Sequence, residues 1–161
     1  MTKNKKIAVD ADSLHKKICS VLLNLAIKKN YEINFVADRP LKQIQSIKDK
    51  NNLNIKIIRV KQGDNSADNW IAEHSEDFLC VITHDVPLAK RITDKGGIVI
   101  DERGTLIKDD NADYFLSERN YMTKLREYGI YEKSSASCPI TEEDVKKFAD
   151  TLNMIVIKNE K

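Results

Sequence analysis

The chain has 161 residues, enough for one domain with a substantial core and no disulfide or metal staple. Basic residues exceed acidic ones by 27 − 25 = 2, so net charge neither predicts nor excludes a polyanionic partner. Its three cysteines are an odd, scattered set, which indicates a reducing, cytoplasmic setting. Because no signal-peptide core and no run of about 18 apolar residues is present, we expect no membrane association.

Short apolar runs alternate with amphipathic stretches along most of the chain. Strands are predicted at 6–10, 33–37, 53–60, 78–82, 98–100 and 105–107. Helices are predicted between them at about 14–29, 41–50, 67–71 and 86–95. The last short strand is expected to pair back across the turn at 101–104. This alternation predicts an α/β fold with three α/β/α layers and a mainly parallel sheet of about five strands.

The remaining third is predicted to be mostly helical. A long helix is expected over 111–128, ended by Gly129. The segment 130–139 lacks periodicity and contains three serines, so we expect a mobile loop there. Thr141 with Asp144 resembles a capping box, and apolar residues at helical spacing follow, which predicts a C-terminal helix over 142–156.

Carboxylates follow two of the predicted buried strands. Asp10 and Asp12 come at the end of the first strand, Asp85 follows the strand 78–82, and Asp68 lies in the first turn of a predicted helix. Parallel strands end at one edge of a sheet, so we expect these four side chains to gather there. They would repel one another without a cation between them. Oxygen ligands suit Mg²⁺ or Mn²⁺, which would bind a phosphate oxygen and activate an attacking water.

Helix capping is the simpler explanation of the same residues. Asp12 and Asp85 each precede a predicted helix, where aspartate is a favoured cap, and Asp68 in a first turn complements the helix dipole. Capping does not explain why Asp10 stands at the end of a buried strand two residues before Asp12. Both interpretations stay open on spacing alone.

Four further side chains are candidates for substrate binding. Thr83, at the end of a strand, is expected either to donate a hydrogen bond to a metal-bound water or only to complete the strand. Arg39, Arg103 and Arg119 are predicted in or near loops, where guanidinium groups can meet phosphates.

Several short motifs follow one another at compatible spacings. They are Val9-Asp-Ala-Asp12, Gly63-Asp64 with Ala67-Asp68-Asn69, Thr83-His-Asp-Val-Pro-Leu-Ala89, Gly96 and Arg103-Gly104. With these, and onward through Gly129, nearly the whole chain resembles the YaiI/YqxD family of small uncharacterised bacterial proteins. The resemblance implies a single PIN-like domain over 1–161, related to metal-dependent ribonucleases, with Asp10, Asp12, Asp68 and Asp85 at the family's acidic positions.

The chain departs from the family pattern in two places. Leu14-His15 stands where the family commonly has Cys-Pro, and Ser137-Cys138-Pro139 stands where it has Gly-Gly-Pro. A chemical role for that family cysteine would therefore be missing in this protein.

Three functions are compatible with these residues. The first is a metal-dependent nuclease acting on RNA through a Mg²⁺ or Mn²⁺ site. The second is a PIN-like module that binds RNA or a protein without catalysis. The third is a phosphatase, since Asp10-Ala-Asp12 also resembles the D-x-D nucleophile motif of haloacid dehalogenases. Those enzymes place a strand-end Ser or Thr before the last acidic motif, whereas Thr83 comes after Asp68.

Overall fold

One mainly parallel sheet forms the centre of the computed structural model, which describes residues 4–63, 65–130 and 139–160. Six strands make up the sheet in this part of the chain, in the order β3-β2-β1-β4-β5-β6. They are β1 Lys6–Asp10, β2 Glu32–Ala37, β3 Ile55–Arg59, β4 Cys80–Ile82, β5 Val99–Ile100 and β6 Leu106–Ile107. The first five strands run parallel, and β6 pairs antiparallel with β5, as the predicted hairpin requires.

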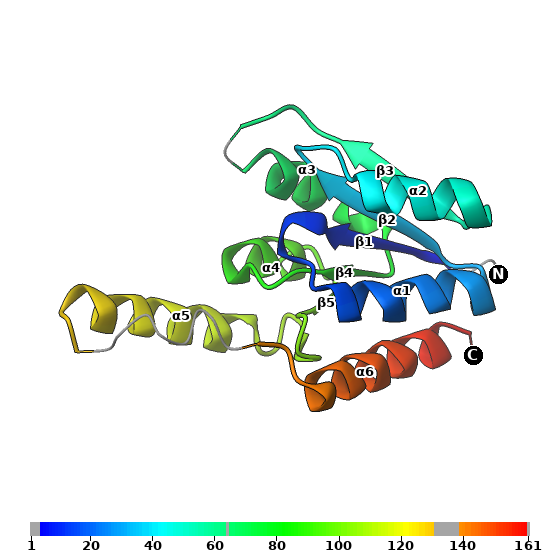
Figure 1. The fold of residues 1–161 in the computed structure, drawn as a ribbon. Helices are drawn as coiled ribbons and strands as arrows, with labels where there is room; N and C mark the ends of the chain where they lie inside the picture. Colours follow the sequence, from blue (N-terminus) through cyan, green and yellow to red (C-terminus); the bar gives the residue numbers. More distant parts are fainter. Residues whose placement is uncertain (1–3, 64, 131–138, 161) are drawn as a thin grey trace.

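Helices connect the strands and cover the sheet (Figure 1). They are α1 Lys16–Lys29, α2 Lys42–Asn51, α3 Ser66–His74, α4 Val86–Thr93, α5 Ala112–Glu127 and α6 Glu142–Glu160. Local signals explain several helix ends. Asn30 and Asn52 adopt the left-handed conformation that ends α1 and α2, and Pro87 lies in the first turn of α4.

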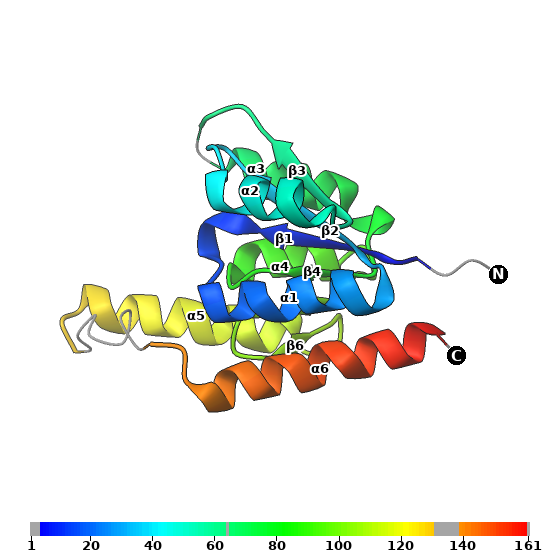
Figure 2. The same cartoon turned by 45° about the vertical axis from the view of Figure 1, so that its right-hand side comes forward.

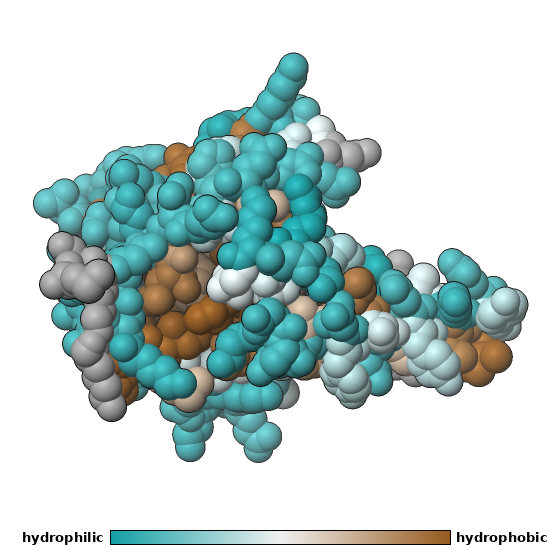
Figure 3. Space-filling model, turned by 180° about the vertical axis from the view of Figure 1, so that it is seen from behind, coloured by the Kyte–Doolittle hydropathy of each residue, from teal (hydrophilic) through white to brown (hydrophobic). Residues whose placement is uncertain are grey.

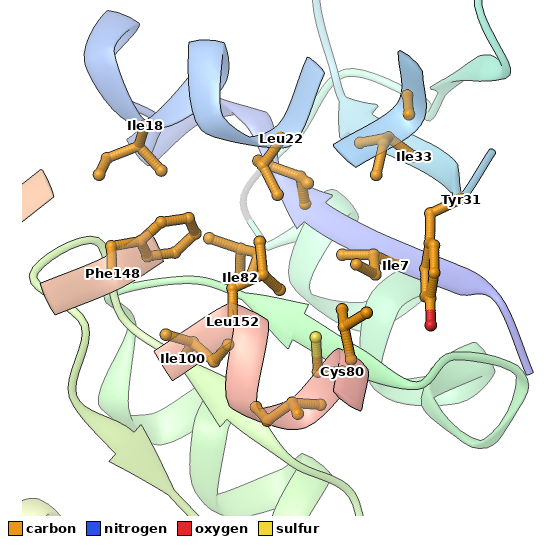
Figure 4. Packing of buried hydrophobic residues seen from close by; sticks show 14 of the residues in the cluster. Ile7, Ile18, Leu22, Tyr31, Ile33, Cys80, Ile82, Ile100, Phe148 and Leu152 are labelled. Atoms are coloured by element: carbon orange, nitrogen blue, oxygen red, sulfur yellow. The ribbon is translucent and has the colours of Figure 1, made fainter. Parts of the chain in front are cut away.

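The strands alternate their side chains between two hydrophobic clusters. Ile7 and Val9 of β1 pack into a cluster with α1 and α6, whereas Ala8 packs into a second cluster with α3 and α4. Figure 4 shows the first cluster, in which α1 and α6 residues meet the sheet. Because helices cover both faces of the sheet, the predicted three-layer α/β/α fold is confirmed.

The C-terminal helix α6 is part of the first cluster. Phe148 is fully buried beside Ile18 of α1 and Ile82 of β4 in that cluster (Figure 4). The turn between β5 and β6 packs closely on this helix. A Cβ added at Gly104, whose φ is +88°, would lie 2.6 Å from backbone atoms of Lys147 and Phe148. Glycine therefore suits this position both by its conformation and by its size.

The structure refines several predicted boundaries. All six predicted strand ranges contribute a strand to the sheet, although about five were expected in it, and α6 extends to Glu160, beyond the predicted end at residue 156. Most of the predicted mobile loop at 130–139 lies outside the described residues. The long predicted helix is confirmed as α5, which extends away from the sheet (Figure 2).

The face of the protein seen from behind is largely polar. Hydrophilic residues cover most of this face, with an apolar area left of the centre of the view (Figure 3). In the described ranges, no helix combines the length and apolar character needed to cross a membrane.

Candidate acidic site

The carboxyl ends of β1, β2 and β4 border a pocket of about 300 Å³. Strand order reverses at β1, since β2 and β3 lie on one side and β4 and β5 on the other. Such switch points are where open α/β sheets form ligand crevices. The pocket is lined by Asp10, Asp12, Asp38, Gly63, Asn65, Ser66, Ala67, Asp68, His84 and Asp85. The four predicted carboxylates therefore lie around one pocket.

Asp10 is held in place from β4. The residue is 7% exposed, and Thr83 Oγ1 donates a hydrogen bond to Asp10 Oδ2 over 3.0 Å. The Asp85 backbone N–H donates in turn to Thr83 Oγ1 over 3.1 Å. Burial raises the pKa of Asp10, and the Thr83 hydrogen bond partly opposes that rise. Thr83 therefore acts on Asp10 from a buried position and is not among the residues lining the pocket.

The side chains of Asp68 and Asp85 interact with each other. Asp85 Oδ1 accepts the Leu88 N–H over 3.0 Å at the start of α4, so the expected capping role is confirmed for this residue. Burial, followed by the nearby charge of Asp85, raises the pKa of Asp68 to about 6. The charge of Asp10 and a hydrogen bond with Asp85 act in the same direction. Asp85 thus has a capping role and also interacts with a neighbouring carboxyl.

Asp12 does not cap α1. It lies in a short 3-10 turn, Ala11–Ser13, and the cap of α1 is His15, whose Nδ1 accepts the Lys17 N–H over 3.2 Å. The capping interpretation of Asp12 is therefore wrong, because the 3-10 turn delays the start of the helix. Arg39 Nε lies 3.2 Å from Asp12 Oδ1, and both side chains are well exposed.

Asp38 also lines the pocket and was not among the predicted site residues. It directly follows β2, just as Asp85 comes shortly after β4. Its position as the first polar residue after a buried strand was the available signal. The pairing of β2 with β1 makes that signal meaningful, because it brings Asp38 to the edge where β1 ends.

The predicted substrate-binding arginines lie in different surroundings. Arg39 is beside the site through its ion pair with Asp12. Arg103 Nη1 donates to Asp144 Oδ2 and so links the β5–β6 turn to α6. Arg119 is exposed in the middle of α5, so its predicted position in or near a loop is wrong. Neither Arg103 nor Arg119 lines the acidic pocket.

The side chains of the pocket have the right chemistry for a hard divalent cation, but they are not arranged to hold one. Aspartate oxygens predominate, which favours Mg²⁺ or Mn²⁺. Within the described part of the chain, however, no three His, Cys, Asp or Glu side chains are grouped so that they could hold a metal ion. Asp12 is paired with Arg39, and one oxygen of Asp85 caps α4. Metal binding would therefore require side chains in the pocket to rearrange.

The raised pKa of Asp68 predicts a pH-dependent cost to stability. Its pKa is 3.8 ordinarily and about 6 in the fold, so between these values the folded chain binds more protons than the unfolded chain. The contribution of Asp68 to the free energy of unfolding therefore falls as pH rises from about 4 to about 6. We expect Asp68→Asn to gain stability relative to wild type between about pH 4 and pH 7 in urea unfolding. Parallel pH profiles for the two proteins would contradict this.

Fold and site together define an α/β protein with an acidic pocket at the carboxyl edge of a mainly parallel sheet. The family model described as "Uncharacterized BCR, YaiI/YqxD family" matches residues 8–158. The chain therefore belongs to the YaiI/YqxD family, as its motifs suggested.

Three relatives described as UPF0178 proteins are similar to this chain over nearly its whole length. Relatives from Saccharophagus degradans and Sulfurimonas denitrificans are each 34% identical to this chain, over 153 and 157 residues. These alignments cover 95% and 96% of this chain, and 96% and 97% of the relatives. A relative from Citrifermentans bemidjiense is 33% identical, with 95% of this chain and 94% of the relative covered.

One solved structure has a weak overall likeness. It is the crystal structure of UDP-GlcNAc 2-epimerase from Neisseria meningitidis bound to UDP-GlcNAc. The TM-score is 0.48 at 16% identity, over 99% of this chain and 45% of that chain. A likeness at this level defines neither a shared fold nor a shared activity.

Proposed function

We propose that this protein is a Mg²⁺- or Mn²⁺-dependent ribonuclease with a PIN-like domain. The observation that supports the proposal most is the placement of Asp10, Asp12, Asp68 and Asp85 around one pocket at the strand switch point. The charge of Asp85 also raises the pKa of Asp68, which means that negative charges at these two positions repel each other. A divalent cation would relieve that repulsion.

The side chains have distinct roles in this proposal. Asp10, oriented by Thr83, would be the buried ligand of the cation, and Asp68 and Asp85 would be further ligands from the same pocket. Asp12 joins the set when Arg39 leaves its ion pair, which frees the guanidinium to contact a phosphate. A cation held by these oxygens would neutralise charge on the phosphate and lower the pKa of an attacking water.

Cleavage of fluorescently labelled single-stranded RNA tests the proposal. We expect wild-type cleavage with Mn²⁺ and none with a chelator. Asp10→Asn and Asp68→Asn should each lower the rate by at least about 100-fold, since loss of a ligand should cost no less than loss of a supporting residue. Asp150→Asn, an exposed carboxylate on α6, is the matched control and should retain the wild-type rate.

Two results would refute the nuclease. One is a wild-type protein that leaves RNA and DNA substrates intact across a series of Mg²⁺ and Mn²⁺ concentrations. The other is cleavage that survives in Asp10→Asn, which would indicate a contaminating nuclease or a different site.

A non-catalytic PIN-like binding module is the second candidate. The Arg39–Asp12 ion pair favours it, together with the lack of a ready ligand group among the described side chains. Such a module would bind RNA or a protein with the same affinity whether Mn²⁺ or a chelator is present. Binding without cleavage, unchanged by Mn²⁺, would therefore select this function over the nuclease.

A further inference from the structure

A second pocket lies between helix α2 and the edge strand β3. Its volume is about 650 Å³, within the range of small-ligand sites. One face of α2 forms one wall, and Ile57 with Arg59 of β3 forms the other. The lining residues are Pro40, Leu41, Lys42, Gln45, Ser46, Asp49, Lys50, Ile57 and Arg59. We call this pocket the α2–β3 groove.

The α2–β3 groove carries cations that are free to meet a ligand. Lys42, Lys50 and Arg59 are exposed, and no ion pair joins any of them to a carboxylate in the described ranges. Asp49 is the acidic member of the lining, and its Oδ1 accepts a hydrogen bond from Gln45 Nε2 over 2.9 Å. The lining therefore carries 3 − 1 = +2 charges, which favours an anionic ligand.

The walls of the groove also offer apolar surface. Pro40, Leu41 and Ile57 lie among the cations in the lining. Ligands that match this combination have flat apolar faces joined by anionic groups, as the bases and phosphates of a nucleic acid strand are. In a duplex the base faces stack on one another and are not available to such residues. A single strand therefore fits the groove better than a duplex does.

The α2–β3 groove adjoins the acidic pocket through three consecutive residues. Asp38 lines the acidic pocket and Pro40 lines the groove. Two residues apart, their Cα atoms are separated by no more than about 7 Å. Arg39 stands between them and pairs with Asp12 of the acidic site. A nucleic acid strand that passes Arg39 can thus contact the acidic pocket and the α2–β3 groove at once.

We propose that the α2–β3 groove binds the segment of single-stranded RNA that extends from the acidic site. This assignment rests on the proposed ribonuclease function for its ligand class. Lys42, Lys50 and Arg59 contact backbone phosphates, Pro40, Leu41 and Ile57 contact bases, and Arg39 bridges the groove to the acidic pocket. The groove thereby holds substrate while the carboxylates remain available to a cation.

Binding of RNA in the presence of a chelator tests the groove separately from catalysis. The probe is a fluorescein-labelled oligouridylate of about ten nucleotides, followed by anisotropy over a series of salt concentrations. Each phosphate contact contributes about 0.7 to the salt slope of a single strand, which is about fivefold in affinity at 0.1 M salt. The double variant Lys42→Gln/Arg59→Gln should therefore bind about 25-fold more weakly, with a slope reduced by about 1.4.

Matched controls separate the groove from general charge effects. Lys146→Gln removes an exposed cation from α6 and should leave affinity and salt slope unchanged. Asp150→Asn, which alters an exposed carboxylate on α6, should also bind the probe as wild type does. A duplex of the same length should bind more weakly than the single strand. Since the substituted side chains are exposed, circular dichroism should show wild-type melting for each variant.

The outcomes distinguish the two proposals. Groove-dependent binding by a protein that never cleaves RNA would support the groove and refute the nuclease. Cleavage with Mn²⁺ whose KM is unchanged in the double groove variant would refute the groove and leave the nuclease standing. Failure of wild type to bind the probe, or equal binding by wild type and double variant, would also overturn the groove assignment and indicate a protein-binding surface instead.

Discussion

Mn²⁺ should stabilise the wild-type protein strongly and leave Asp68→Asn unaffected. At about 100 times its dissociation constant, a ligand that binds only the folded chain raises the free energy of unfolding by about 2.7 kcal/mol. The stabilisation should be greater at pH 7 than below about pH 6. At pH 7 Asp68 has lost the proton that competes with the cation. Urea unfolding with and without Mn²⁺ measures the effect.

Two variants of Asp85 separate its charge from its capping role. Asparagine is itself a good N-cap, so Asp85→Asn should retain the hydrogen bond from the Leu88 N–H while losing the Mn²⁺ response. Asp85→Ala should lose that response and also about 1 kcal/mol of metal-free stability. Asp150→Asn, outside the pocket, should respond to Mn²⁺ as wild type does. An equal effect of Mn²⁺ on the free energy of unfolding of wild type, both Asp85 variants and Asp150→Asn would contradict a metal site in this pocket. No effect on wild type would contradict it as well.

Phe148→Ala should lower the free energy of unfolding by about 3–5 kcal/mol. Phe148 is fully buried in the cluster that joins α6 to α1 and the sheet, so truncation removes apolar contacts and leaves a cavity. The loss is a large part of the 5–15 kcal/mol typical of a whole domain. Denaturant unfolding, followed by far-ultraviolet circular dichroism, checks the value.

The matched control for Phe148 lies on the same helix. Ile157 is 45% exposed, so Ile157→Ala should change stability by no more than about 0.5 kcal/mol. A similar, small loss in both variants would mean that α6 contributes little to the folded core. A separate unfolding transition for α6 would contradict its place in one cooperative core.

The acidic site was largely predictable because its signals are local. Asp10 and Asp85 come at or shortly after the ends of apolar runs, and parallel strands deliver such residues to one edge. The cap formed by Asp85 and the position of Pro87 depend on neighbours within one helical turn. The same kind of reasoning failed for Asp12, because the 3-10 turn after β1 moves the cap of α1 to His15.

Contacts between distant segments were not predictable in the same way. Asp38 belongs to the acidic pocket because β2 pairs with β1, and Arg103 pairs with Asp144 because α6 packs beside the β5–β6 turn. The α2–β3 groove likewise depends on how a helix rests on the edge strand that follows it. In each case, the type of residue alone does not distinguish such a contact from an ordinary exposed position.

The hydrophobic periodicity, turn residues and caps already specified where strands and helices follow one another along the chain. They also specified the α/β class and four carboxylates at strand or helix ends. These features depend on residues a few positions apart, whose preferences survive in any context. Folding in three dimensions determined which polar side chains became partners: Thr83 with Asp10, Asp68 with Asp85, and Arg39 with Asp12. Those pairings depend on strand order and close packing, which join residues that are distant along the chain.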